Sequence, residues 1–181
     1  MSFAFSRRSF LKYTAVAAVA VAGASLFTGC KIDTSDSYNA LRTTPGELTV
    51  LQVTAAMGKY VEASKSYTAP DVTRTTTTIA FPFKITNGRA NPIYVNPNNF
   101  KATVLDAEGK VILAKYTASN GLTLDASLCD TNLKKGASVS GNVNLTLSAA
   151  LEPGQSVVLT YCPDLQYNEY SLNWKTTCAK D

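Results

Sequence analysis

Apolar side chains recur at every second position through most of this chain, and this alternation constrains the fold more than any other feature. It is clearest in the segments IAFPFKI at 79–85 and VSGNVNLTL at 139–147. A period of two sends successive side chains to opposite faces of a strand. The sequence therefore predicts β-strands, each with one buried face, and no convincing helix.

About eight strands are expected, separated by turns rich in proline, glycine and asparagine. They cover residues 48–53, 73–87, 93–95, 100–105, 111–116, 139–147, 156–161 and 170–177. Residues 117–136 are expected to be irregular, and 55–63 is the segment that could form a helical turn. Pro82 has no N–H, so an edge position or a bulge is expected there. Short strands spaced in this way are typical of an antiparallel all-β sandwich or barrel.

The order of these segments resembles a known group of domains. The resemblance is carried by IAFPFKITN at 79–87, a short proline-containing link, Asn99-Phe100 and LDAEG at 105–109. These features are similar to the telokin-like, immunoglobulin-like domains found behind lipoprotein signals in Gram-positive bacteria. The resemblance covers residues 47–178. It implies an immunoglobulin-like β-sandwich without catalytic residues, and a fold does not by itself assign a function.

The first thirty residues have the layout of a signal peptide, in which a basic start precedes an uncharged, apolar segment. The segment SRRSFLK at 6–12 comes first, and residues 13–29 carry no charge. This order resembles the twin-arginine export motif, carried here by Arg7, Arg8, Phe10, Leu11 and Lys12. The resemblance implies a translocon that moves folded proteins. The alternative is a short membrane helix with a basic flank, because about 17 apolar residues barely span a bilayer.

The apolar segment ends in LFTGC at 26–30, which resembles a bacterial lipobox. The resemblance implies lipid attachment at Cys30, cleavage after Gly29 by a signal peptidase, and anchoring on the extracytoplasmic face of the cell membrane. The alternative is an ordinary cleavage site beside a cysteine. Three parts are therefore expected: a signal peptide at 1–29, a lipidated cysteine with a flexible tether at 30–46, and the sandwich at 47–181.

Several classes of chemistry are excluded or disfavoured by composition. The chain contains no histidine, so it offers no Ser-His-Asp triad and no imidazole base or metal ligand. No phosphate-binding or dinucleotide-binding motif is present, and no cofactor is expected. Without the three basic residues of the export motif, 14 basic residues face 13 acidic ones. A nucleic-acid partner is therefore not expected.

Three cysteines remain beyond Cys30, and an extracytoplasmic domain permits disulfides. Strand order places Cys129 and Cys162 at one end of the predicted sandwich and Cys178 at the opposite end. A Cys129–Cys162 disulfide is therefore the tentative prediction. Cys178 is left as a thiol or pairs between molecules. A three-cysteine metal site matches no ligand spacing. Asp125 and Asp130 could help to hold calcium, although they lack the pattern of a calcium loop.

Tyrosines near the C-terminus form the candidate binding surface. Tyr161, Tyr167 and Tyr170 surround the segment PDLQ, and tyrosines on loops of a rigid scaffold often bind partners. The favoured alternative is that they pack at strand ends, and Trp174 is expected in the core. The leading hypothesis is a lipid-anchored, non-catalytic binding or accessory module for an envelope protein, a glycan or a small ligand. A self-associating envelope spacer is the second hypothesis, and an enzyme is the third.

Overall fold

The expected alternation produces a β-sandwich in the computed structural model, which describes residues 39–112, 121–129, 131–165 and 170–179. Contacts divide the chain into residues 1–32 and 33–181, and every described residue belongs to the second unit. The predicted export motif and lipidation site therefore lie outside the described residues. The part of the chain that the structure describes contains no helix with the length and hydropathy that a bilayer crossing requires.

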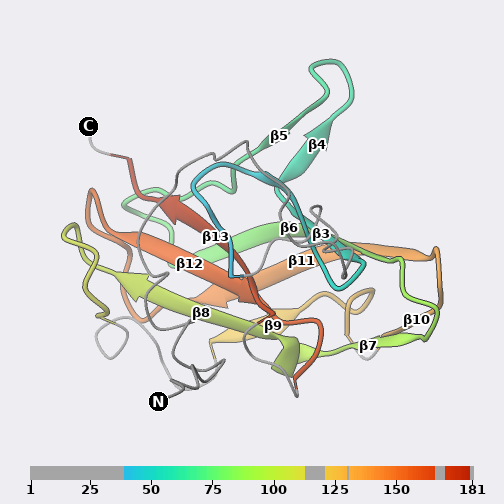
Figure 1. The fold of residues 1–181 in the computed structure, drawn as a ribbon. Coiled ribbons are helices and arrows are strands. Elements are labelled where there is room, and N and C mark those ends of the chain that lie inside the picture. The colour runs from blue at the N-terminus through green and yellow to red at the C-terminus, as the bar shows by residue number, and fades with distance from the viewer. Residues whose placement is uncertain (1–38, 113–120, 130, 166–169, 180–181) are drawn as a thin grey trace, which may run out of the picture. The chain divides into compact units, whose positions relative to one another are not determined.

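The larger sheet has five antiparallel strands in the order β2-β3-β6-β11-β9 (Figure 1). Its strands are β2 (Gly46–Val50), β3 (Val53–Met57), β6 (Thr78–Asn87), β11 (Ser138–Thr146) and β9 (Leu122–Leu124). The longest ladder joins β6 to β11, with pairs running from Ser138↔Thr86 to Thr146↔Thr78. These two central strands carry the clearest alternation in the sequence.

The smaller sheet has four strands in the order β1-β13-β12-β8. They are β1 (Leu41–Arg42), β13 (Leu172–Thr177), β12 (Ser156–Tyr161) and β8 (Phe100–Leu105). A two-stranded pair joins β7 (Ile93–Val95) to β10 (Thr131–Leu133), and a 3-10 turn, η1 (Pro97–Asn99), precedes β8. A separate hairpin of β4 (Lys59–Val61) and β5 (Ser66–Thr68) projects from the sandwich at the top of Figure 1.

An aromatic cluster occupies the core between the two sheets. The Phe83 ring on β6 makes edge contacts with Phe100, Tyr161 and Trp174, with ring centroids 5.1–5.8 Å apart. Trp174 and Tyr161 are buried, which confirms the core position expected for Trp174. Because such rings bury large apolar areas and prefer edge contacts, this cluster is a main source of attraction between the sheets.

Pro82 lies in β6, a central strand, and the pairing continues through Asn142↔Pro82 without a bulge, so the expected edge position is wrong. On the other side, β3 pairs only as far as Met57↔Phe83, and the Gly58 N–H donates to the Pro82 carbonyl at 2.8 Å. The N–H and C=O of a strand residue point to the same side. The missing N–H of Pro82 therefore faces the side on which β3 has ended, and the β6–β11 ladder loses no bond.

Other sequence expectations need correction near the N-terminal end of the domain. Residues 48–53 do not form one strand, because Leu51 and Gln52 adopt positive φ angles of 50° and 61° and turn the chain between β2 and β3. Residues 55–63 hold the end of β3, Gly58, β4 and the start of the β4–β5 turn, and they form no helical turn. Their run of small residues carries no clear period, and the pairing of β3 with β6 and of β4 with β5 decides their conformation.

Two further segments differ from expectation. Residues 117–136 contain β9 and β10, whose three-residue lengths are too short to show an alternation. The hairpin after β8 keeps its expected turn, with Gly109 at a φ of 86°. Within the described residues, its second strand is represented by one bridge, between Val111 and Leu105. Residues 113–116 of that expected strand lie outside the described residues.

The folded part of the chain begins within the predicted tether. β1 pairs in parallel with β13, and the Asn173 N–H donates to the Ala40 carbonyl at 3.0 Å. Ser171 adds a side-chain hydrogen bond to Asn39 at 2.6 Å. The boundary predicted at residue 46 is therefore wrong by several residues. A two-residue strand has no period of its own, and the neighbouring sheet edge supplies its hydrogen-bond partners.

Candidate functional site

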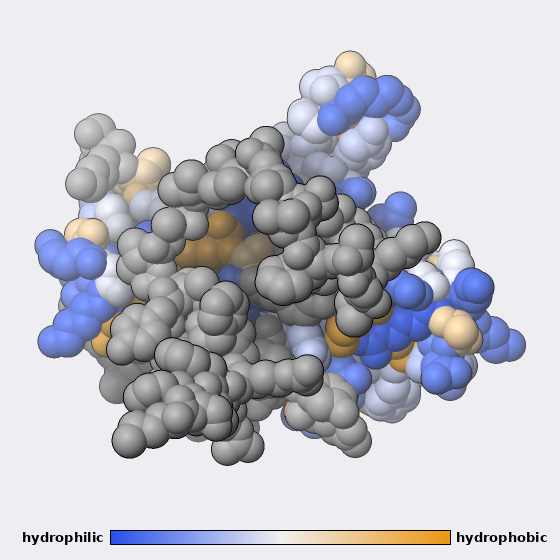
Figure 2. Space-filling view, in the orientation of Figure 1, coloured by the Kyte–Doolittle hydropathy of each residue, from blue (hydrophilic) through white to orange (hydrophobic). Residues whose placement is uncertain are grey.

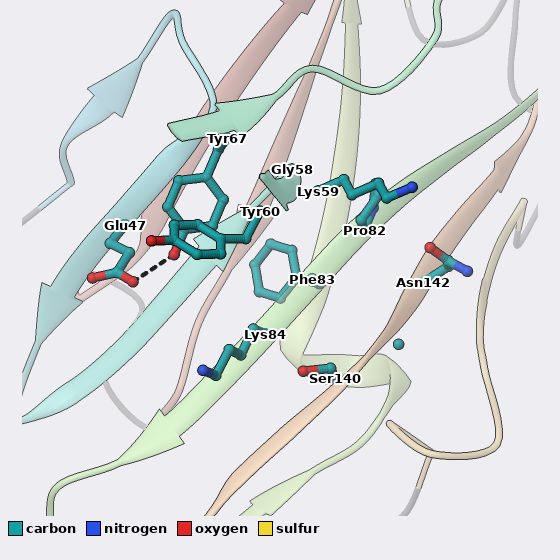
Figure 3. A pocket seen from close by; sticks show the side chains of 11 residues that line it. Glu47, Gly58, Lys59, Tyr60, Tyr67, Pro82, Phe83, Lys84, Ser140 and Asn142 are labelled. Carbon is teal, nitrogen blue, oxygen red and sulfur yellow. Dashed lines mark hydrogen bonds between the residues drawn. The ribbon is translucent and has the colours of Figure 1, made fainter. Parts of the chain in front are cut away.

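A groove of about 460 Å³ lies between the outer face of the five-stranded sheet and the β4–β5 hairpin (Figure 3). Its size falls within the range of small-molecule sites. Side chains from three sheet strands (β2, β6 and β11) and from the hairpin surround it, namely Glu47, Lys59, Tyr60, Tyr67, Pro82, Lys84, Ser140 and Asn142. The surface of the projecting hairpin is mostly polar in Figure 2.

Gly58 positions the hairpin over the sheet. It joins β3 to β4 with a φ of 109°, a conformation that favours glycine. A Cβ at this position would lie 2.6 Å from the Thr68 carbonyl oxygen and 2.7 Å from Pro45 Cβ. The absence of a side chain therefore lets the two hairpin strands leave the sheet at a sharp angle and hold their aromatic residues over the groove.

Two tyrosines from the hairpin form the aromatic part of the groove. Tyr60 and Tyr67 are directly opposite in the β4–β5 ladder, with ring centroids 5.1 Å apart. The Tyr67 hydroxyl donates to Glu47 Oε1 at 2.5 Å, as the dashed line in Figure 3 shows. Partial burial, this hydrogen bond and the Glu47 charge raise the pKa of Tyr67 to about 12. Glu47 thereby connects the hairpin to β2, while Tyr60 keeps 46% of its surface exposed.

The sheet face below the hairpin carries polar side chains in register. Ala56, Lys84 and Ser140 are consecutive partners across β3, β6 and β11, so Lys84 and Ser140 are neighbours on the outer face. The next row of cross-strand partners on this face carries hydroxyl side chains. Thr49 and Thr54 are 2.9 Å apart between their Oγ atoms, and Thr86 lies 2.7 Å from Ser138 in the same way.

Asp125 supports this face from the loop after β9. Its carboxylate accepts hydrogen bonds from the Asn142 backbone N–H at 2.8 Å, the Asn142 amide at 2.9 Å and the Asn144 amide at 3.1 Å. These donors lower the pKa of Asp125, the backbone bond most strongly. Asp125 therefore orients amides on β11, which is a different role from the suggested calcium ligand. Asp130 lies outside the described residues. Within the part of the chain that the structure describes, no group of three acidic or cysteine side chains could hold a metal ion.

The predicted tyrosine surface is not assembled. Tyr161 is 1% exposed and packs against Phe83 and Phe100, and burial raises its pKa. Tyr170 is half-buried against the core. Tyr167 lies outside the described residues. Placing Tyr161 in a binding surface is therefore wrong, and the alternative that it packs at the end of its strand is correct.

The three described cysteines are thiols, and no disulfide joins any two of them. Cys162 donates from Sγ to the Asp164 carbonyl at 3.1 Å. Cys178 lies beyond the opposite end of the β12–β13 ladder, where its N–H donates to the Gln155 carbonyl. This agrees with the expectation that Cys178 and Cys162 lie at opposite ends of the sandwich. The predicted Cys129–Cys162 disulfide is absent. Two cysteines at the same end of a sandwich do not necessarily have the Cβ separation and direction that a disulfide requires.

The groove was not predicted from the sequence. A signal for it exists in KYVEASKSYT at 59–68, where two tyrosines flank a short polar turn. Such a segment is consistent with a hairpin. Its position over β6 and β11 depends on pairs between residues far apart in the chain.

Comparisons with family models and with curated proteins give no match. Among solved structures, a Bacillus subtilis protein described as a candidate lipoprotein, ycdA, has 15% identity and a TM-score of 0.44, over 75% of this chain and 38% of that one. The yjhA protein of Bacillus subtilis has 9% identity and a TM-score of 0.43, over 76% of this chain and 98% of that one.

A family 123 glycoside hydrolase from Clostridium perfringens has 13% identity and a TM-score of 0.43, over 71% of this chain and 27% of that one. This chain thus spans less than half the length of ycdA and of the hydrolase. These values assign neither a family nor a function to this chain.

Proposed function

We propose that this protein is exported by the twin-arginine route, anchored through lipid on Cys30, and acts as a non-catalytic binding module at the extracytoplasmic face of the membrane. The export motif at 6–12 and the lipobox-like segment at 26–30 support the location. The binding role is carried by one observation, the exposed Tyr60 ring held above a polar sheet face by the Tyr67–Glu47 contact. Rigid aromatic side chains next to polar groups are common in binding surfaces.

The chemistry of the groove favours binding over catalysis. The chain has no histidine. Among the described residues that line the groove, Glu47 is the one carboxylate, and it accepts the Tyr67 hydrogen bond. Glycoside hydrolysis generally uses two carboxyl groups on either side of the scissile bond. The groove residues therefore supply recognition groups without such a pair.

Location is tested by changing the two signals separately. Cys30→Ala should abolish palmitate labelling and release the protein from the membrane fraction. Replacing Arg7 and Arg8 by lysine should leave unprocessed precursor inside the cell. Continued lipid labelling of Cys30→Ala, or unchanged export of the double lysine variant, would contradict the proposed route and anchor.

The binding surface is tested by photo-crosslinking in living cells. Benzoylphenylalanine at position 60 should give light-dependent adducts. The same residue at position 111 is the control, because Val111 is 57% exposed and lies outside the groove. Equal products at both positions, or none at position 60, would refute the groove as the binding surface.

A self-associating envelope spacer is the second candidate, and it is favoured by one feature of the smaller sheet. β1 pairs only with Asn173 and Trp174, so Lys175–Thr177 of β13 have no strand partner on that side among the described strands. An open edge can pair with another chain. Sedimentation analysis up to millimolar concentration distinguishes the two candidates, because a spacer should form oligomers and a binding module should stay monomeric.

A further inference from the structure

We infer that the ligand of the groove is an acidic oligosaccharide, with one sugar ring against Tyr60 and carboxylates near Lys59 and Lys84. This inference rests on the proposed binding function and names its ligand class. It follows from three features of the groove: the aromatic ring, the kind of polar groups on the sheet face, and the balance of charge.

The aromatic ring offers a flat, apolar surface of the size of a sugar ring. A cross-strand tyrosine pair by itself stabilises a hairpin, and an isolated two-stranded hairpin needs such support. That role explains the contact between Tyr60 and Tyr67. It does not require Tyr60 to remain 46% exposed at a groove above polar side chains. A pyranose presents apolar C–H groups on its face and hydroxyls at its rim, which matches a ring above a polar surface.

The polar groups of the groove belong to side chains rather than to the backbone. The outer face below the hairpin belongs to β6 and β11, whose backbone groups pair with each other along the whole shared ladder. A peptide bound as an added strand needs open backbone groups at a sheet edge. The groove instead offers a hydroxyl on Ser140, an amide on Asn142 and ammonium groups on Lys59 and Lys84. Such a mixture of donors and acceptors suits a ligand with many hydroxyl groups.

The charge of the groove favours an anion. Neither the Lys59 nor the Lys84 ammonium forms an ion pair or hydrogen bond among the described residues, whereas Glu47 accepts from Tyr67. In Figure 3 the Lys59 and Lys84 ammonium groups lie toward opposite ends of the groove. Each can attract a carboxylate and donate charge-assisted hydrogen bonds to it. Two cations are few for a nucleic acid, whose binding depends on many phosphate contacts. An acidic saccharide therefore fits better than a neutral one.

The test uses the purified full protein in a detergent without a sugar headgroup, with four hexasaccharides as probes. Hexagalacturonate and a hyaluronan hexamer are the acidic probes, and maltohexaose and cellohexaose are the neutral ones. Calorimetry should show acidic probes binding with Kd values below about 1 mM and at least about tenfold tighter than the neutral probes. Affinity should fall in 0.5 M salt, because exposed charge contacts are screened.

Variants assign the binding to named side chains. Tyr60→Ala should weaken binding at least about tenfold, while Tyr60→Phe should retain it because the ring is kept. Lys84→Gln should reduce the preference for acidic probes, because Lys59 alone remains, without disturbing the hairpin. Lys110→Gln is its matched control, because Lys110 is an exposed lysine in the turn after β8, outside the groove.

Each result decides the inference. Equal binding of neutral and acidic probes, unchanged binding by Lys84→Gln, or no binding of any probe at about 10 mM would overturn it. If position 60 still gives specific adducts in cells when no probe binds, the ligand class is wrong and the proposed binding function stands. If neither experiment gives a signal, both are wrong.

Discussion

The indole N–H of Trp174 donates a 2.9 Å hydrogen bond to the carbonyl oxygen of Gly46, which joins β13 in the smaller sheet to β2 in the larger one. Both residues are buried, and the Trp174 ring also packs against Phe83. A directed bond inside an apolar core restricts how the two sheets can shift relative to each other, because a displaced indole would leave a buried polar group without a partner.

Trp174→Phe should reduce the free energy of unfolding by about 2 kcal/mol. Phenylalanine keeps an aromatic ring but removes the donor to Gly46, and a lost buried hydrogen bond costs roughly 1–3 kcal/mol. The smaller ring also leaves unfilled volume. Urea unfolding followed by circular dichroism measures the change. A loss below about 0.5 kcal/mol would mean that the indole bond contributes little to holding the sheets together.

Asn87→Asp should destabilise the domain by about 2–4 kcal/mol, although the two side chains have nearly the same shape. The buried Asn87 amide donates to the Leu133 carbonyl at 2.9 Å and to the Asn91 carbonyl at 3.0 Å. Aspartate would place a carboxylate oxygen against both carbonyls. Thermal and urea unfolding measure the effect, with Asn98→Asp on the exposed surface as the matched control. Equal losses in the two variants would contradict the specific role of Asn87.

Asp125→Asn should flatten the dependence of stability on acidic pH. Hydrogen bonds to the carboxylate lower the folded-state pKa of Asp125 below its ordinary value of 3.8. This stabilisation is therefore complete above pH 3.8 and is lost as the pH falls through the lower folded-state pKa. Unfolding midpoints measured from pH 6 to pH 2 should fall less in Asp125→Asn than in the wild type. Asp71→Asn, at an exposed carboxylate, should follow the wild-type curve.

The raised pKa of Tyr67 predicts an effect of Glu47 on the groove. Burial is the largest cause of the value of about 12, and the Glu47 hydrogen bond and charge add to it. Glu47→Gln removes the charge, so the Tyr67 pKa should fall toward the ordinary 10.0 while staying above it. Titration by ¹³C NMR of labelled tyrosine rings measures this, and Tyr67→Phe assigns the resonance.

The raised pKa of Tyr67 also determines how its contribution to the free energy of unfolding changes with pH. Because the folded-state pKa of Tyr67 is raised, its contribution is complete below pH 10 and is lost as the pH rises from 10 to about 12. In Glu47→Gln the loss should be smaller and should be complete at lower pH. An unchanged Tyr67 pKa in this variant would show that Glu47 does not hold the hairpin in solution.

The strands with a clear period are found close to where they are expected. The segments at 93–95, 100–105 and 156–161 match β7, β8 and β12, and 139–147 differs from β11 by one residue at each end. Trp174 is correctly expected in the core. These successes share a cause, since a strand with one buried face must alternate and its pattern is local.

Local pattern fails where pairing decides the conformation. β1, β9 and β10 have two or three residues each, and their sequences carry no period. The sequence predicts an edge position or a bulge for Pro82, because proline has no N–H to donate. The central strand β6 accepts it because β3 ends one residue earlier in the ladder. Where β3 ends is not visible in the local sequence. Tyr161 was a candidate for a surface because tyrosine serves both in cores and in binding sites.

The amino-acid pattern alone is sufficient to predict an all-β chain, its main strands and the absence of imidazole chemistry, because alternation and composition are properties of short segments. The groove depends on something else. Glu47, Tyr60, Lys84 and Ser140 become neighbours through the register of β2, β3, β6 and β11 and through the turn at Gly58. Register arises from packing and hydrogen bonding between distant segments, and a local pattern does not encode those contacts.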